Sequence, residues 1–389
     1  MTSWGSNRLC KTLLSDEKQR RRREQQHVLD DAKPPSVLVN MTFGCREMFE
    51  THEVGTGNWI WLFYAMRLAA RAHGNVDFNA KCADEDAERT REQLVIPWII
   101  GHFGPDNEGS VAAEQDESLL RQACGGQQKA PLWHMIPAMR RDLGIMAESL
   151  VGVPEWHGDR LDGQVKTNPP KYGDIELDET AWHFRCGDVM YSRHSGYAWH
   201  QFGLLASHIP DDTRSIGIVT QPFDNHRTPQ MKALENAPKE SVLRKSSLAC
   251  ERLAHTLVDY LQSRFPSARV RIRNDPSEGV ALAYSRMIAA KHTVVGGVST
   301  FGAYAALASW GRAVVIAPDF DHAPGKWLLA WEKSRTEDDA SMVMVHDPHP
   351  LLLPDAIRLW WMTKGGKDAM IEWLTDDTEG EIIVNKASR

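Results

Sequence analysis

Long hydrophobic runs are missing from this chain of 389 residues: no stretch of eighteen apolar residues occurs, and the N-terminus lacks the apolar core of a signal peptide. We therefore expect no membrane span. An excess of positive charge is missing as well, because the formal net charge is -7 at pH 7. This charge argues against a general nucleic-acid-binding protein, whose surface would be basic, but it still allows a local basic pocket for a nucleotide.

Cysteines at metal-ligand spacing are also missing. The six cysteines, at positions 10, 45, 82, 124, 186 and 250, form no C-x-x-C pair and no zinc-ligand pattern with histidine. We therefore expect no structural zinc. The even number allows disulfide bonds without requiring them, so the cysteines do not identify the compartment.

The composition is that of a soluble globular protein, with 42% hydrophobic and 25% charged residues. The length suggests about two domains. We expect a polar N-terminal tail over residues 1–33, a first domain over 34–177, a second domain over 178–345, and a helical segment and tail over 346–389.

Strand-like and helix-like segments alternate in the second domain. Short apolar runs predict strands over residues 181–184, 215–220, 268–273, 293–296 and 313–317. Helices are expected between them over residues 240–265, 278–291 and 301–310. This alternation indicates an α/β fold, in which a parallel sheet is covered on both faces as in a Rossmann-like domain. In such a sheet, ligands bind beyond the carboxyl ends of the strands.

The first domain begins with a similar pattern. A strand over residues 36–40 is followed by the glycine loop 53–58 and by an apolar helix over residues 59–72. The loop places Gly55 and Gly57 before a helix N-terminus, where backbone N–H groups can meet a polar ligand. The same glycines would equally serve tight packing of the helix against the strand. Apolar side chains at helical spacing predict an amphipathic helix over residues 131–150.

One short motif lies at the expected end of the strand 181–184. His183-Phe184-Arg185-Cys186-Gly187-Asp188 combines an arginine, a glycine and a carboxylate. A guanidinium forks onto phosphate oxygens, and a glycine lets the backbone approach a ligand closely. The alternative interpretation is an ordinary strand end, where Arg185 simply pairs with Asp188.

A second motif follows the strand 293–296. Ser299 and Thr300 open the next helix, where a hydroxyl either caps the helix or donates to a phosphate at the positive end of the helix dipole. Because both motifs lie at carboxyl ends of strands in one parallel sheet, we expect them at the same edge.

The chain resembles the fucosyltransferase superfamily that includes the α-1,2-, α-1,6- and protein O-fucosyltransferases. Three motifs carry the resemblance, in the family's order: Gly55-Thr56-Gly57-Asn58-Trp59, the H-x-R-x-G-D signature from His183 to Asp188, and Val298-Ser299-Thr300-Phe301. The resemblance implies a GT-B-like architecture, in which two Rossmann-like domains face each other across a cleft. It further implies an inverting, metal-independent glycosyltransferase, without a cofactor, that transfers fucose from GDP-fucose to a hydroxyl of a glycan or protein.

The resemblance also implies roles for individual residues. Arg185 would bind the diphosphate beside Gly187, and His183 would face the nucleotide. Ser299 and Thr300 would donate to phosphate, and Phe301 would lie near the base. Gly57 and Asn58 would hold the donor from the first domain.

Two roles are less well defined by the motifs. The candidates for the general base are Asp188 and Glu53, and the alternative is that each is structural, with Asp188 orienting Arg185. Relatives often read guanine with an acidic residue in the helix before the serine motif, where this chain has Ala283 and Tyr284. Glu278 and Asp275, just upstream of these two residues, could substitute for the acid, and a different nucleotide sugar is the alternative.

Two other functions stay open. One is an inactive glycan- or nucleotide-binding protein that keeps the fold. The other, which we rank last, is an oxidoreductase, because the loop at Gly55 does not continue into the G-x-G-x-x-G that a dinucleotide requires. The eukaryotic members of the superfamily act in the Golgi or endoplasmic reticulum, but without a visible anchor a cytoplasmic protein is the alternative.

Overall fold

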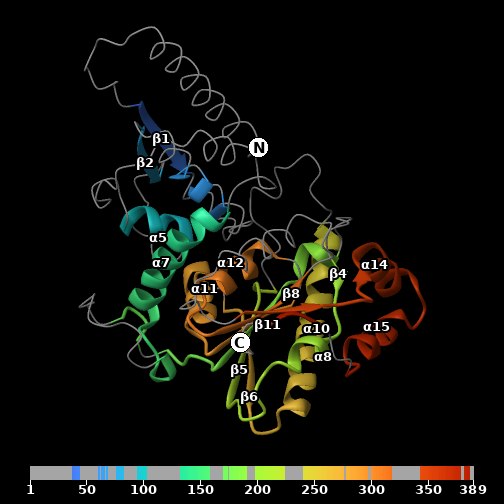
Figure 1. Ribbon diagram of the computed structural model, residues 1–389. Coiled ribbons are helices and arrows are strands. Elements are labelled where there is room, and N and C mark those ends of the chain that lie inside the picture. Colours follow the sequence, from blue (N-terminus) through green and yellow to red (C-terminus); the bar gives the residue numbers. More distant parts are fainter. Residues whose placement is uncertain are drawn as a thin grey trace, which may run out of the picture.

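The computed structural model describes the residues of the following ranges, apart from 62, 66, 174 and 276: 37–43, 60–68, 76–82, 94–102, 132–157, 170–190, 198–223, 240–296, 299–317, 342–377 and 381–385. Figure 1 shows their elements, coloured along the chain. The expected tail 1–33 and the loop 53–58 lie outside these residues.

A seven-stranded sheet forms the centre of the described structure. Its strands are β3 (Thr180–Phe184), β5 (Ser215–Val219), β6 (Arg269–Arg273), β7 (His292–Gly296), β8 (Arg312–Ala317), β9 (Met342–His346) and β11 (Glu381–Asn385). The first six are parallel, and β11 runs antiparallel to β9. The five expected strands are confirmed, and the fold class is α/β. The strands β5, β7, β8 and β9 are rich in valine or isoleucine because both of their faces are buried, whereas the edge strand β6 is partly exposed.

The strand order is β11-β9-β8-β7-β3-β5-β6. The chain therefore leaves β3 in one direction to β5 and β6, then returns to the other side of β3 and continues to β7, β8 and β9. This order is compatible with a Rossmann-like fold, and the direction reverses between β3 and β7. These two strands end level with each other, since Phe184 pairs with Gly296.

Helices cover both faces of the sheet. Four lie over one face: α8 (Phe202–Ala206), α10 (Glu240–Arg264), α14 (Leu353–Met362) and α15 (Gly366–Leu374). Two lie over the other: α11 (Val280–Ala289) and α12 (Thr300–Ala308). Because side chains alternate along a strand, Trp182 and Phe184 of β3 enter the core beneath α10, while His183 faces α12.

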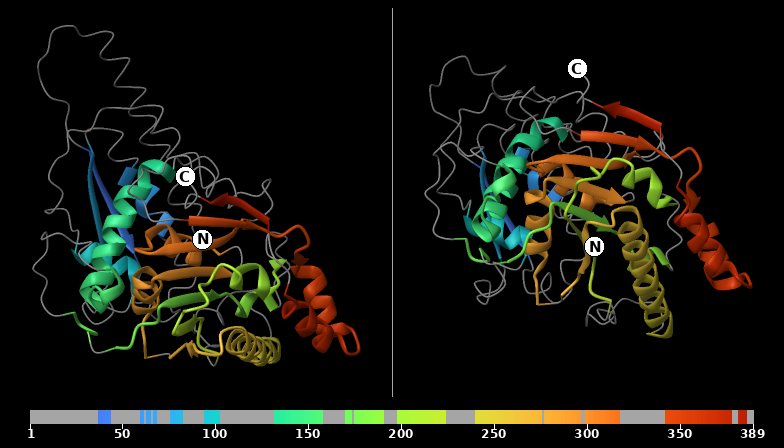
Figure 2. Two further views of the ribbon diagram at one scale, coloured as in Figure 1. Left: turned by 60° about the horizontal axis from the view of Figure 1, so that its bottom comes forward. Right: turned by 90° about the horizontal axis from the view of Figure 1, so that it is seen from below.

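The N-terminal helices extend the second of these layers. α5 (Val95–His102) and α7 (Leu132–Val151) share one apolar core with α11 and α12. Figure 2 shows α7 on the opposite side of the sheet from α14 and α15. The expected amphipathic helix is confirmed in α7, whose buried residues include Ile136, Met139, Leu143, Met146 and Leu150.

Of the expected first Rossmann-like domain, the described residues include a parallel pair of strands, β1 (Val37–Phe43) and β2 (Val76–Cys82), and helical residues between 60 and 68. Tyr64 and Arg67 of this helical segment both donate to the buried Asp142 of α7, over 2.9 and 2.7 Å. The cleft between two Rossmann-like domains stays a prediction.

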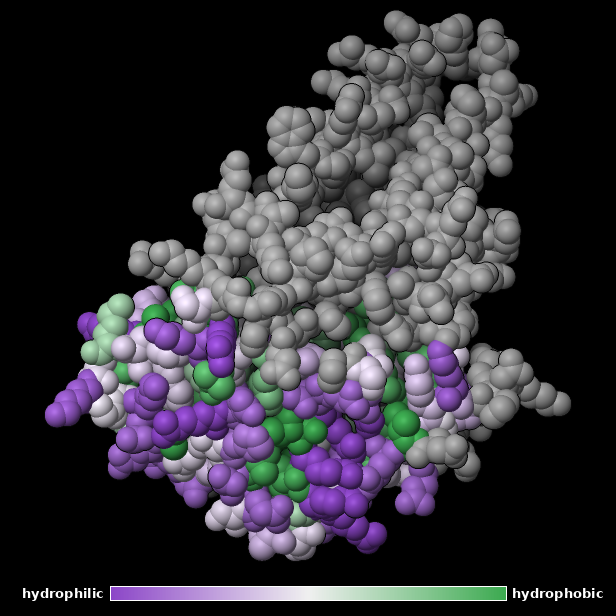
Figure 3. Space-filling view, turned by 180° about the vertical axis from the view of Figure 1, so that it is seen from behind, coloured by the Kyte–Doolittle hydropathy of each residue, from purple (hydrophilic) through white to green (hydrophobic). Residues whose placement is uncertain are grey.

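The C-terminal segment differs from the expected helical segment and tail. Its helices are α14 and α15, but residues 381–385 form β11 and extend the sheet. A short antiparallel pair, β4 (Ala198–Trp199) with β10 (Leu351–Leu352), precedes α8 and α14. Among the described helices, none is long and apolar enough to cross a membrane. Figure 3 shows a largely polar face with small apolar patches.

Candidate functional site

The two sequence motifs meet where the strand order reverses. Arg185 follows the end of β3, and Ser299 follows the end of β7. Nη1 of Arg185 donates to Oγ of Ser299 over 3.3 Å. A cation and a hydroxyl from positions 114 residues apart therefore lie together at the edge of the sheet where Rossmann-like proteins bind ligands.

Ser299 is the N-cap residue of α12, yet its side chain does not cap the helix. Its backbone is extended, with φ -131° and ψ 121°, and its hydroxyl makes no capping hydrogen bond. Thr300 begins the helix. The first backbone N–H groups of a helix lack intrahelical partners and carry partial positive charge. The start of α12 beside Arg185 is therefore suited to an anion.

His183 lies behind this edge, packed beneath α12. Its ring stacks on Phe301, with 5.3 Å between centroids and 23° between planes. Gly302 approaches so closely that a Cβ there would lie 2.6 Å from Nδ1 of His183. Burial, with a smaller contribution from the charge of Arg185, lowers the pKa of His183 to about 3. His183 is therefore a neutral packing partner of Phe301 here.

Phe301 is held on its other side by Tyr284. Their rings meet edge to face, with centroids 4.5 Å apart, and the Tyr284 hydroxyl donates to the carbonyl oxygen of Phe301 over 2.8 Å. Tyr284 occupies a position where the resemblance to fucosyltransferases would place a guanine-reading acid. In this structure its hydroxyl positions the first turn of α12.

Gly187 and its neighbours form a short 3-10 turn, η3 (Gly187–Met190), that is tied to α10. Cys186 forms a disulfide bond with Cys250 of α10, and the Gly187 N–H donates to the Cys250 sulfur over 2.8 Å. Gly187 has a φ of 75°, and a Cβ there would clash with the Gln221 side-chain amide. The backbone at Gly187 thus closely approaches a protein side chain. Asp188 lies within this turn.

Glu278 is engaged by an arginine. It accepts from Nε and Nη2 of Arg286 over 3.0 and 2.7 Å, and Arg286 also donates to the carbonyl oxygen of Glu176. The carboxylate expected to read guanine therefore already has a cationic partner next to the start of α11.

Three expected site residues, Glu53, Gly57 and Asn58, lie outside the described residues. So does Asp319-Phe320-Asp321, which follows β8 closely and whose carboxylates are of the type that binds Mg²⁺. Within the described ranges, no group of three or more metal-binding side chains comes together. Metal independence stays a prediction.

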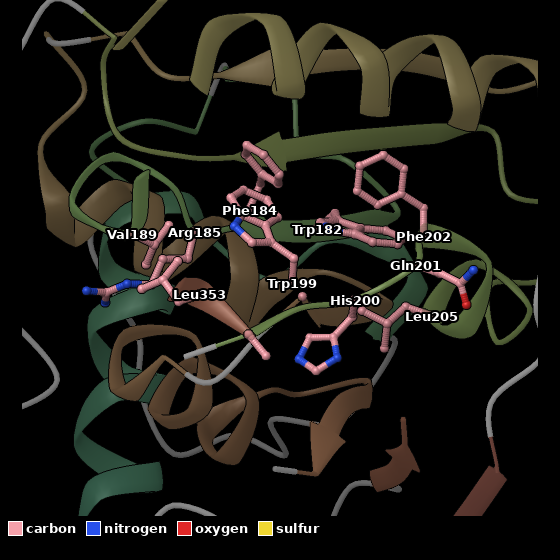
Figure 4. A pocket seen from close by; sticks show the side chains of 12 residues that line it. Trp182, Phe184, Arg185, Val189, Trp199, His200, Gln201, Phe202, Leu205 and Leu353 are labelled. Carbon is pink, nitrogen blue, oxygen red and sulfur yellow. The ribbon is translucent and has the colours of Figure 1, made fainter. Parts of the chain in front are cut away.

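A small pocket of about 30 Å³, open to solvent, lies at the carboxyl ends of β3 and β7 (Figure 4). Its walls are mainly apolar and aromatic, as is usual for ligand pockets. The lining residues are Trp182, Phe184, Arg185, Val189, Ala198, Trp199, His200, Gln201, Phe202, Leu205, Gly296 and Leu353. Arg185 belongs both to this pocket and to the contact with Ser299.

Sequence reasoning did not identify His200 of this pocket or its partner. His200 follows β4 and Asp347 follows β9, and Nδ1 of His200 lies 2.7 Å from Oδ2 of Asp347. Both side chains are almost fully buried, with exposed fractions of 7% and 4%. A histidine and an aspartate separated by 147 residues, without a surrounding motif, carry no sequence signal for such a pair.

Comparisons with protein-family models, curated proteins and solved structures found no match for this chain. The geometry of the site is therefore the basis for its interpretation.

Proposed function

We propose that this protein is an inverting glycosyltransferase that transfers fucose from GDP-fucose to a hydroxyl of a glycan or protein, without a metal ion. The observation that supports this most is the meeting of Arg185 and Ser299 at the start of α12, beside an apolar pocket. This edge offers charge for a diphosphate, and the small pocket beside it offers apolar and aromatic surface for part of a sugar or base.

The chemistry requires charge stabilisation at this place. When the bond between the sugar and the diphosphate breaks, negative charge grows on the leaving phosphate, and only interactions that strengthen then accelerate transfer. A guanidinium and backbone N–H groups held in advance can stabilise this charge. Arg185 and α12 would supply them.

The proposal includes the GT-B-like arrangement and the remaining roles that the resemblance implies. Gly57 and Asn58 would hold the donor from the first domain, and Asp188 or Glu53 is the base that the family pattern suggests. Glu278 would bind guanine only if its hydrogen bonds with Arg286 were replaced by hydrogen bonds with the guanine ring.

The test is GDP release from GDP-fucose, measured with EDTA and separately with Mg²⁺. We expect equal activity in both. Arg185→Ala should weaken GDP binding by about 10- to 100-fold, the loss of a hydrogen bond to a charged group, while the melting temperature stays near that of the wild type. The control is Arg264→Ala. Nη1 of Arg264 lies 3.5 Å from Oδ1 of Asp211, and this pair is at the opposite edge of the sheet.

Two results would count against the proposal. Without GDP-sugar binding or turnover by the wild type, the function is wrong. GDP binding without turnover would instead support the second candidate, an inactive nucleotide- or glycan-binding protein, which the engaged state of Glu278 favours.

A further inference from the structure

His200 presents one ring nitrogen to Asp347 and leaves the other unpaired. Nε2 of His200 is buried and has no hydrogen-bond partner among the residues that the structure describes. His200 itself lines the pocket that also contains Arg185, and Figure 4 shows the two side chains at different sides of it. Because buried polar groups are normally paired, this nitrogen can accept a hydrogen bond from a water, a ligand or a reacting group.

The partner of Nδ1 determines what Nε2 can do. A carboxylate accepts, so Nδ1 must donate, and the neutral ring then has its lone pair on Nε2. Asp347 is itself held in place, because its Oδ1 accepts from the backbone N–H of His349 over 2.8 Å. The neutral imidazole is thus held in the tautomer that can accept a proton at Nε2.

We propose that His200, rather than the Asp188 or Glu53 that the family pattern suggests, is the general base of the transfer reaction and that Asp347 is its positioning residue. This inference rests on the proposed function. The acceptor oxygen forms a bond to the anomeric carbon of the sugar, and the bond from that carbon to the diphosphate oxygen breaks, its electron pair leaving with the diphosphate. The acceptor proton moves to Nε2 of His200. The resulting imidazolium is stabilised by the Asp347 carboxylate and returns its proton to water after the products leave.

The competing explanation is a structural pair that only joins β4 to the end of β9. The variant His200→Asn distinguishes the catalytic role from the structural one. The Asn side-chain NH₂ can still donate to Asp347, whereas nothing replaces Nε2. Asp347→Asn is the second variant, which keeps the shape and removes the charge. His157→Asn is the matched control, since His157 is a partly buried histidine whose Nε2 contacts the Ala289 carbonyl oxygen over 2.9 Å, away from the pocket.

The experiment measures GDP release from GDP-fucose with water as the acceptor, together with GDP affinity by calorimetry. For His200→Asn we expect kcat to fall by about 10²- to 10⁴-fold, the usual contribution of a general base, with KM for the donor and GDP affinity unchanged. Asp347→Asn should lower kcat in the same way, also without a change in KM. ¹⁵N NMR of the wild type should show the His200 ring protonated at Nδ1.

Each contrary outcome has its own meaning. If the wild type turns over and His200→Asn keeps the kcat of His157→Asn, the pair is structural and the inference is overturned, while the proposed function stands. The same holds if Asp188→Asn abolishes turnover and His200→Asn does not. If the wild type neither binds nor cleaves a GDP-sugar, the proposed function fails first, and the role of His200 as base fails with it.

Discussion

Replacing Gly302 by alanine tests how closely α12 packs on the sheet. A Cβ at Gly302 would lie 2.6 Å from Nδ1 of His183 and 2.7 Å from Cγ1 of Val295. Neither neighbour can move aside easily, because the His183 ring is stacked on Phe301 and Val295 is fully buried. The substitution must therefore lift α12 away from β3 and β7.

The expected cost combines two opposing effects. Overpacking of a core costs about 1–3 kcal/mol, and contacts this short point to the upper end. Alanine in place of glycine within a helix returns about 1 kcal/mol. We therefore expect Gly302→Ala to lower the free energy of unfolding by about 2 kcal/mol, which is roughly 4 °C in melting temperature.

The assay is thermal unfolding, followed by GDP titration. The control is Gly365→Ala, where φ is 75° and no atom lies within 4 Å of the added Cβ, so the cost of about 1–2 kcal/mol comes from backbone strain alone. Only Gly302→Ala should also weaken GDP binding, because lifting α12 moves Ser299. A Gly302→Ala protein as stable as the wild type would refute the close packing of α12.

Two further predictions concern stability. The pKa of His183 is about 3 in the folded protein and about 6.5 in the unfolded chain, so the unfolded chain binds more protons between these two pH values. The contribution of neutral His183 to the free energy of unfolding is therefore fully present above pH 6.5. It falls towards pH 3, by at most about 1.4 kcal/mol per pH unit. In urea unfolding between pH 6.5 and 4.5, the free energy of unfolding should fall less steeply with decreasing pH for His183→Gln than for the wild type. Equal slopes for the two proteins would contradict this prediction. Removing the Cys186–Cys250 disulfide, which spans 64 residues, with the double variant Cys186→Ser/Cys250→Ser should cost about 4 kcal/mol in urea unfolding. An unchanged midpoint would show that the bond does not form.

Much of the central sheet could be predicted from local patterns. The runs that became β3, β5, β6, β7 and β8 are short and bounded by polar or helical segments, and α7, α10, α11 and α12 were expected near their observed bounds. β11 was not expected, because an antiparallel edge strand within a polar C-terminal segment depends on its partner β9 for pairing.

The site was only partly predictable. Arg185 and Ser299 could be placed at one edge because parallel strands end on the same side, and the structure brings them within 3.3 Å. The engagement of Glu278 by Arg286 and the burial of His183 under α12 could not be foreseen, because a partner's identity depends on packing between separate elements.

The amino-acid sequence determines which segments form strands and helices, because periodicity and side-chain type act locally. It also determines the residue types that could contact an anion. The order of the strands, with β7 returning beside β3, and the pairing of His200 with Asp347 depend on the folded chain. Both arise from packing between segments distant in sequence, where burial and complementary shape, rather than neighbouring residues, select the partner.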